Sequence, residues 1–155
     1  MKPNQKLTAI DLFAGCGGLS LGLEQSGFTP IMMVELNSNA RQSYLMNRQG
    51  QDILATDDIK DVVQNIDDIK YQLEEKYATS PEWTPDLIAG GPPCQGFSGM
   101  GHRRSYSVDK EQLPSNHLYQ DMAFVISKLQ PKMFLFENVR GLLTSKWNPS
   151  GTKGE

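Results

Sequence analysis

Cys94 is the residue of this 155-residue chain most suited to nucleophilic chemistry. It follows a short apolar run at residues 86–89, and open α/β sheets hold their ligands at the carboxyl ends of such strands. Pro92 and Pro93 restrict the backbone that leads to the sulfur, whereas glycines recur in the residues that follow it. An ordinary thiol has a pKa near 8.5, so a reactive site must lower that pKa or remove the proton on binding. The alternative for a lone cysteine is an inert, buried side chain.

Glu137 is the second candidate for catalysis. It follows the mostly apolar residues 132–136, which we predict to form a buried strand, so its carboxylate should emerge at the end of that strand. Burial would favour the protonated form of the carboxyl group, which could then share a proton with a ring nitrogen of a substrate. The structural alternative is an ion pair with Arg140.

A local positive patch follows Cys94 in an otherwise acidic chain. Residues 95–115 show no sustained periodicity and are predicted to form a long loop, a feature that is usually functional or disordered. This loop holds Ser98 and, close behind it, His102, Arg103 and Arg104. Taken alone these residues indicate a solvated loop; beside Cys94 they indicate contacts to phosphate groups.

A glycine-rich turn at residues 13–18 joins a predicted strand to a predicted helix. Glycines let the backbone turn tightly and approach a ligand, and the helix N-terminus offers N–H groups to an anion. Glu35 lies twenty residues after Gly15, at the end of the next predicted strand, where a carboxylate commonly accepts ribose hydroxyls. Together the turn and Glu35 predict a nucleoside-type cofactor, although the turn alone could reflect tight packing. The sequence lacks the Gly-Lys-Ser/Thr of an ATP-binding loop.

Two further positions carry less decisive signals. Asp57, Asp58 and Ile59 stand where the third strand should lead into its helix. A carboxylate there could accept a hydrogen bond from an adenine amino group while Ile59 packs on the ring; the alternative is that Asp57 or Asp58 caps the helix. Cys16 is interpreted as a small packing residue inside the glycine turn.

The elements that must position these residues alternate in type along the chain. Short apolar runs predict strands, and 3.6-residue periodicity predicts helices between them. This order is typical of an α/β fold with a mostly parallel sheet. Strands are predicted at residues 7–13, 31–35, 52–54 (weakly), 86–89 and 132–136, and helices at 18–27, after Asn37, across 57–77 and at 116–130.

Composition limits the possible classes of protein. The chain is 38% hydrophobic and 21% charged, as expected for one globular domain, and no apolar run reaches the eighteen residues of a membrane span. A formal net charge of −3 argues against a polybasic protein that holds nucleic acid by charge alone. Two distant cysteines are too few for a disulfide framework or a zinc site, so we expect no metal. The N-terminus lacks the features of a signal peptide, and we expect a reduced, cytosolic location.

In combination these motifs resemble those of the DNA cytosine-5 methyltransferases. Residues 13–18 are similar to the cofactor motif of that family, residues 91–98 to its catalytic loop and residues 137–139 to its Glu-Asn-Val motif, all in family order within residues 7–143. Residues 116–118, at the start of the intervening helix, also fit. The resemblance implies a Rossmann-like methyltransferase fold that binds S-adenosyl-L-methionine. The residues implied to bind this cofactor are Phe13, Gly15, Gly17, Gly18, Leu19, Glu35, Leu36, Asp58, Ile59, Pro92 and Leu118.

The resemblance also implies a reaction on double-stranded DNA. The target cytosine is flipped out of the duplex, the Cys94 thiolate adds to carbon 6, and Glu137 stabilises a proton at ring nitrogen 3. Carbon 5 then takes the methyl group, its proton is removed, and Cys94 leaves, with S-adenosylhomocysteine as the second product. Ser98, Arg103 and Arg104 are expected to contact the DNA.

The family pattern contains further strands, a target-recognition region and a C-terminal motif that these 155 residues do not show. We therefore expect residues 1–143 to be the N-terminal part of an incomplete catalytic domain, with a loop at residues 144–155, and residues 132–136 to form a bare apolar sheet edge. A separate C-terminal fragment or subunit could supply the rest, and the chain alone should be inactive. The expected setting is a bacterial restriction–modification system in the cytoplasm. The alternatives are a cofactor-binding fragment without catalysis, a transfer-RNA methyltransferase of the same family, and a nucleotide-dependent oxidoreductase.

Overall fold

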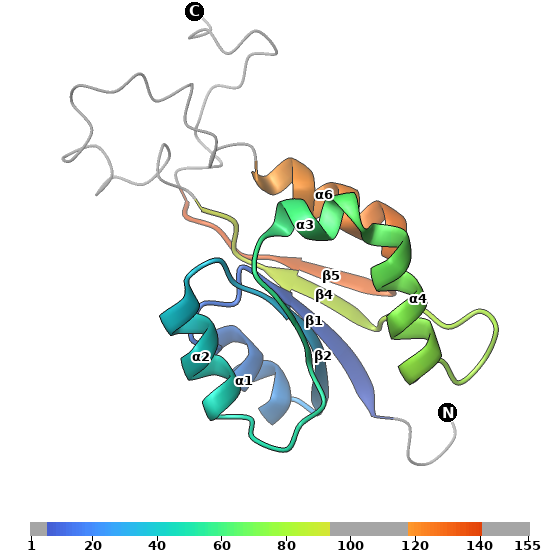
Figure 1. Cartoon of the computed structure of the whole chain (residues 1–155), viewed down its shortest axis with the longest axis horizontal. Helices are drawn as coiled ribbons and strands as arrows, with labels where there is room; N and C mark the ends of the chain where they lie inside the picture. Colours follow the sequence, from blue (N-terminus) through green and yellow to red (C-terminus); the bar gives the residue numbers. More distant parts are fainter. Residues whose placement is uncertain (1–5, 94–117, 141–155) are drawn as a thin grey trace, which may run out of the picture.

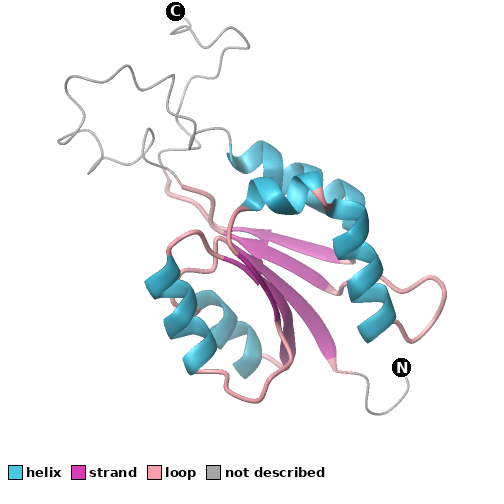
Figure 2. Ribbon diagram, viewed as in Figure 1, coloured by secondary structure: helices cyan, strands magenta, loops and turns pink. Residues whose placement is uncertain are grey.

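A computed structural model describes residues 6–93 and 118–140 of the chain. Five parallel strands form one sheet in the order β3-β2-β1-β4-β5, with helices on both faces (Figures 1 and 2). The predicted α/β class with a parallel sheet is confirmed. The elements are β1 Leu7–Leu12, α1 Gly18–Gln25, β2 Phe28–Val34, α2 Ser38–Met46, β3 Leu54–Thr56, α3 Ile59–Gln64, α4 Ile66–Tyr77, β4 Leu87–Gly90, α6 Leu118–Leu129 and β5 Met133–Phe136.

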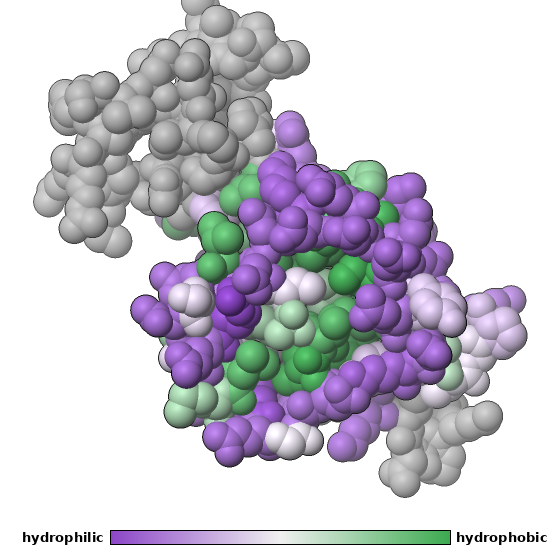
Figure 3. All heavy atoms as spheres, viewed as in Figure 1, coloured by the Kyte–Doolittle hydropathy of each residue, from purple (hydrophilic) through white to green (hydrophobic). Residues whose placement is uncertain are grey.

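The helices divide between the two faces of the sheet. Helices α1 and α2 cover one face, and α3, α4 and α6 cover the other (Figure 1). Because side chains alternate along a strand, Ile10 and Leu12 join the core cluster under α3, α4 and α6, while Ala9 packs with Leu19 of α1 on the other face. Figure 3 shows hydrophilic side chains over the helices and apolar side chains gathered between the two helical layers. Burial of these apolar faces against the sheet is the main stabilising term.

Several predicted boundaries differ from the structure. The predicted helix across residues 57–77 is two helices, because Asn65 has φ −111° and ψ 27° and leaves the helical conformation between α3 and α4. Strand β2 begins three residues earlier than expected, and β3 lies two residues later. Strand β1 ends at Leu12 because Phe13 adopts a positive φ of 64°.

The prediction that residues 132–136 form a buried strand is wrong. Among the described residues, strand β5 pairs only with β4, so it forms the edge of the sheet in this part of the chain, and all four of its side chains are exposed. Phe134, for example, is 63% exposed. The prediction of an apolar sheet edge at these residues is therefore confirmed.

The strands bring their carboxyl ends to one edge of the sheet. The register pairs Leu12 with Val34 and with Gly90, Val34 with Thr56, and Gly90 with Phe136. The loops that follow these five residues must start side by side, and they carry the motifs found in the sequence. In the described part of the chain, no helix has both the length and the apolar character needed to cross a membrane.

Candidate active site

The glycine turn that follows β1 holds an unusual backbone conformation. Phe13, Gly15 and Gly17 all have positive φ, at 64°, 55° and 90°. A bulky residue such as Phe13 adopts this conformation only where its surroundings impose it, and such residues cluster at functional sites. The turn is closed by a hydrogen bond from the Gly17 N–H to the Ala14 carbonyl (2.9 Å). Helix α1 then starts without a side-chain cap, which leaves its first N–H groups available to a ligand.

Glu35 ties the glycine turn to the end of β2. Its Oε2 accepts a hydrogen bond from the Gly15 N–H (2.8 Å), and its Oε1 accepts one from the Asn37 N–H (2.8 Å). The Glu35 carbonyl in turn accepts a hydrogen bond from Arg41 Nη1 (2.7 Å). A carboxylate oxygen can accept more than one hydrogen bond, so Glu35 can hold the turn and still accept from a ligand hydroxyl. The next side chain, Leu36, is apolar yet 71% exposed at the same edge, which suits packing on a planar ring.

Asp58 is the N-cap of α3, as one of the two interpretations predicted. Its Oδ1 accepts a hydrogen bond from the Lys60 N–H (2.9 Å), while Asp57 forms an ion pair with Arg41 at 3.1 Å. The adenine contact expected of Asp58 remains a prediction. Ile59 is only 3% exposed and belongs to the core, so a ring could reach little of its side chain.

Glu137 lies against the segment that leads to Cys94. Its N–H donates to the Gly90 carbonyl (2.9 Å), and a Cβ on Gly91 would stand 2.7 Å from Glu137 Oε2. The absence of a side chain at Gly91 is therefore what lets the carboxylate occupy this position. Glu137 is exposed, contrary to the expected burial, because β5 is an edge strand. Among the described residues, no ion pair joins Glu137 to Arg140, so the structural alternative for this carboxylate is not supported.

Asn138 fixes the proline segment beside Glu137. Its Nδ2 donates a hydrogen bond to the Pro92 carbonyl (3.3 Å), and its Oδ1 accepts one from the Val139 N–H (2.8 Å). Pro92 is buried. The sequence interpretation assigned no role of their own to Asn138 and Gly91; a glycine directly before two prolines was the only available signal.

The other predicted site residues divide into two groups. Cys94, Ser98, Arg103 and Arg104 lie outside the described residues. Gly18 opens α1 with free space where a Cβ would stand, while Leu19 and Leu118 are half-buried against the core clusters.

The interpretation of Cys16 as a packing residue is wrong: its side chain is exposed, because the positive-φ glycines on either side turn it outward.

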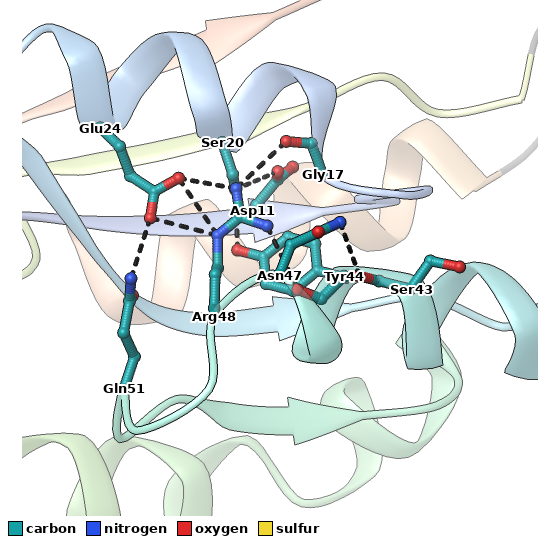
Figure 4. A network of polar contacts seen from close by, with 9 residues as sticks. All are labelled: Asp11, Gly17, Ser20, Glu24, Ser43, Tyr44, Asn47, Arg48 and Gln51. Atoms are coloured by element: carbon teal, nitrogen blue, oxygen red, sulfur yellow. Dashed lines mark hydrogen bonds and ion pairs between the residues drawn. The ribbon is translucent and has the colours of Figure 1, made fainter.

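A buried polar network that the sequence interpretation missed lies against the glycine turn (Figure 4). Asp11 of β1 is 1% exposed, and its Oδ2 accepts a hydrogen bond from Ser20 Oγ (2.5 Å). Ser20 Oγ lies 2.8 Å from the Tyr44 hydroxyl, and Arg48 packs on the Tyr44 ring. Burial raises the pKa of Asp11 to about 6. An aspartate within a mostly apolar strand was the sequence signal that could have identified this network.

The geometry therefore supports two adjoining sites at one edge of the sheet. The glycine turn, Glu35 and Leu36 can hold a nucleoside whose charged group faces the start of α1. Next to it, Glu137 stands beside the Pro92–Pro93 segment that leads to a cysteine.

Comparisons with known proteins agree with this arrangement. The Haemophilus parahaemolyticus protein named Type II methyltransferase M1.HphI is 34% identical, with the match covering 96% of this chain and 36% of that protein. For DNA (cytosine-5)-methyltransferase PliMCI of Paracentrotus lividus, the identity is 36% over 94% of this chain and 9% of the relative. A solved structure of an E. coli prophage protein, described as a DNA modification methyltransferase, matches with a TM-score of 0.65 and 36% identity over 88% of this chain and 33% of its own.

These matches cover nearly all of this chain but only about a third of the bacterial proteins. The neighbouring structure shows that the sheet is that of a methyltransferase fold. A family model described as C-5 cytosine-specific DNA methylase matches residues 7–150. Because that match spans nearly the whole sequence, the chain belongs to the C-5 cytosine-specific DNA methylase family.

Proposed function

We propose that this chain is the cofactor-binding and catalytic part of a methyltransferase that modifies carbon 5 of cytosine in double-stranded DNA. The observation that carries the proposal is the placement of Glu137, whose carboxylate lies over Gly91, three residues before Cys94 and at the same sheet edge as the glycine turn. A nucleophile and an acid that act on one ring must lie close together, and Cys94 is only three residues from Gly91 in the sequence.

The described residues of the turn fit S-adenosyl-L-methionine. The Glu35 carboxylate would accept the ribose hydroxyls, and the exposed Leu36 side chain would pack on the adenine, with Asp58 near its amino group. The uncapped start of α1 suits the carboxylate of the methionine part. When bound, this cofactor supplies an electrophilic methyl group, and S-adenosylhomocysteine is left. The remaining predicted contacts come from Phe13, Gly15, Gly17, Gly18, Leu19, Ile59, Pro92 and Leu118.

The chain's own residues would activate the cytosine. The target base must leave the helical stack to reach the site. The Cys94 thiolate forms a bond to carbon 6, and Glu137 holds a proton at ring nitrogen 3, so that electron density moves to carbon 5. After carbon 5 is methylated, a base removes its proton, the bond between the sulfur and carbon 6 breaks, and the ring double bond is restored. Cysteine suits this role because a thiolate both adds and departs readily.

The rest of the activity rests on parts beyond those described here. Ser98, Arg103 and Arg104 are proposed to contact DNA phosphates, in keeping with their residue types. The exposed apolar edge strand β5 is proposed to pair with the remaining polypeptide, either as a continuation or as a separate C-terminal fragment. The named type II relative supports a role in bacterial restriction–modification. A cytoplasmic location is proposed together with that role. Without such a complement, we propose that the chain binds cofactor but does not turn over.

Methyl transfer from labelled S-adenosyl-L-methionine to double-stranded DNA tests the proposal. The complete or complemented protein should transfer the label, and Cys94→Ser should transfer none while it binds S-adenosylhomocysteine as tightly as the wild type. Retained transfer in Cys94→Ser would refute the covalent mechanism. Turnover by the isolated 155 residues would refute the requirement for a complement.

A further inference from the structure

We propose that Arg48 is a positioning residue that holds the glycine turn in the conformation that the cofactor requires. This inference rests on the proposed function, in which the turn and the start of α1 hold S-adenosyl-L-methionine. Arg48 itself lies just beyond the end of α2, and among the described residues its hydrogen bond to the proposed ligand site goes to the carbonyl of Gly17.

The Arg48 guanidinium is buried, with the residue only 6% exposed, and each of its three nitrogens donates at least one hydrogen bond. Nη2 and Nε form hydrogen bonds to the Glu24 carboxylate on α1, the shortest at 2.7 Å. Nη1 donates to the Tyr44 carbonyl (3.3 Å), and Nη2 also donates to the Gly17 carbonyl (3.2 Å). Arg48 thus joins α2, α1 and Gly17 of the turn through a single planar group (Figure 4).

The absence of a side chain at Gly17 leaves the space that the Arg48 guanidinium occupies. A Cβ on Gly17 would stand 2.6 Å from Arg48 Nη1 and 2.7 Å from Cδ2 of Tyr44, and the positive φ of Gly17 also disfavours any side chain. The Gly17 carbonyl accepts a hydrogen bond from Arg48 and another from the Leu21 N–H (3.0 Å), which lies in the first turn of α1. The orientation of this one peptide group therefore sets the direction of the first N–H groups of the helix.

The Tyr44 ring packs against one face of the Arg48 guanidinium. The guanidinium carbon lies 4.0 Å from the centre of the Tyr44 ring, within the range of a cation–π interaction. The Ser20 hydroxyl donates to Asp11, so its oxygen must accept the proton of the Tyr44 hydroxyl, since each hydroxyl has a single proton. The tyrosine is consequently held through its hydroxyl group, and its ring presents a fixed face to the Arg48 guanidinium.

The contribution of the Arg48–Glu24 ion pair to the stability of the fold does not by itself explain why it is buried here. A buried ion pair seldom stabilises a protein more than apolar residues of the same volume, because both charges must leave water. Its contribution is instead to select one arrangement of the groups it joins, here the turn and the start of α1. Loss of Arg48 should therefore affect the glycine turn more than it affects the core.

Arg48→Met is the direct test, because methionine keeps an unbranched apolar stem and removes every donor. Lys132→Met is the matched control. It also breaks an ion pair to a buried carboxylate, that of Asp86 (Nζ to Oδ1 2.6 Å), but this pair lies at the amino ends of the strands, away from the glycine turn. Hydrogen exchange of the Gly17 and Leu21 amides in the full chain reports on the turn without any ligand. Calorimetric titration with S-adenosylhomocysteine reports on the cofactor site, and urea denaturation reports on the stability of each variant.

We expect Arg48→Met to raise exchange at Gly17 and Leu21 and to weaken S-adenosylhomocysteine binding by about tenfold, as for the loss of one charge-assisted hydrogen bond. Lys132→Met should change neither. Arg48→Lys, which keeps a charge but cannot reach Glu24 and Gly17 together, should fall between the wild type and Arg48→Met. Unchanged exchange at both amides in Arg48→Met and Arg48→Lys would overturn the proposal, as would faster exchange with unchanged affinity. If the wild-type chain binds no S-adenosylhomocysteine, the proposed cofactor site fails, whereas the exchange data still decide whether Arg48 positions the turn.

Discussion

Replacing Asp11 by asparagine should change how the stability of this protein depends on pH. Asp11 is buried against Ser20 and Tyr44, and its pKa is raised from 3.8 to about 6, chiefly because burial disfavours the charged form. Arg48 and the hydrogen bond from Ser20 oppose this effect, and Glu35 adds to it. Asparagine has nearly the same shape and can accept the same hydrogen bond from Ser20, but it carries no titrating proton.

The direction and the size of the pH effect on the free energy of unfolding follow from the two pKa values of Asp11, folded and unfolded. Between pH 3.8 and about 6 the folded protein binds the Asp11 proton more tightly than the unfolded chain does, so the free energy of unfolding falls as the pH rises. Each unit between the two values corresponds to about 1.36 kcal/mol, which makes the whole loss about 3 kcal/mol above pH 6. Asp11→Asn lacks this loss. Its free energy of unfolding, relative to that of the wild type, should therefore rise by about 2.4 kcal/mol between pH 4 and pH 7, because a small part of the whole loss has already occurred at pH 4.

Urea denaturation of the full chain at half-unit steps of pH measures this difference. Groups that titrate equally in both proteins, such as Asp86 with its lowered pKa, cancel when the two curves are subtracted. Any constant cost of burying an amide in place of the carboxyl shifts the difference without tilting it. Asp68→Asn, at an exposed position of α4, controls for the loss of one negative charge. A difference between Asp11→Asn and the wild type that stays level across this range would refute the reasoning.

Two further substitutions test the contacts made at the two ends of β4. Asp86→Ala should lower the free energy of unfolding by about 3 kcal/mol in urea denaturation, because the Thr8 N–H and hydroxyl both donate to this buried carboxylate (2.7 and 3.0 Å) and would lose their acceptor. Gly91→Ala should slow methyl transfer by the complete protein at least about tenfold, because the new Cβ would displace the Glu137 carboxylate. The same variant should bind S-adenosylhomocysteine normally.

Each of these changes has a control in the same chain. Lys132→Ala removes the exposed partner of Asp86 and should cost less than about 1 kcal/mol, as for surface ion pairs. Equal losses for both substitutions would show that the lysine, and not the Thr8 hydrogen bonds, carries the interaction. Gly22→Ala, in α1 with free space around the new methyl group, should leave methyl transfer unchanged. A Gly91→Ala enzyme as fast as Gly22→Ala would contradict the placement of Glu137.

The location of the candidate site followed from sequence because parallel strands end together. Once the apolar runs had been assigned to strands, the residues after them had to meet at one edge, and Glu35, Gly15 and Glu137 do so. The period of the apolar residues also identified the buried face of α3 and α4, although not the break at Asn65, because Val62 and Ile66 are buried on either side of it.

Other features depend on neighbours that no local pattern reveals. Periodicity shows which residues are apolar but not how many strands flank them, so edge strand β5 and an interior strand have the same pattern. Arginine is usually exposed, and nothing near Arg48 in the sequence indicates that Glu24 and Gly17 surround it. The N-cap role of Asp58 was predictable because it needs only the two residues that follow.

The two halves of the candidate site differ in how firmly they are held. Glu35 already accepts hydrogen bonds from Gly15 and Asn37, and Arg48 fixes the carbonyl of Gly17, so the cofactor side is organised before any ligand binds. Little conformational freedom would remain to be lost there on binding. Glu137, by contrast, extends from β5, which in the described part of the chain is paired on one side only. We infer that cofactor affinity is set within these residues, whereas catalysis depends on whatever pairs with β5.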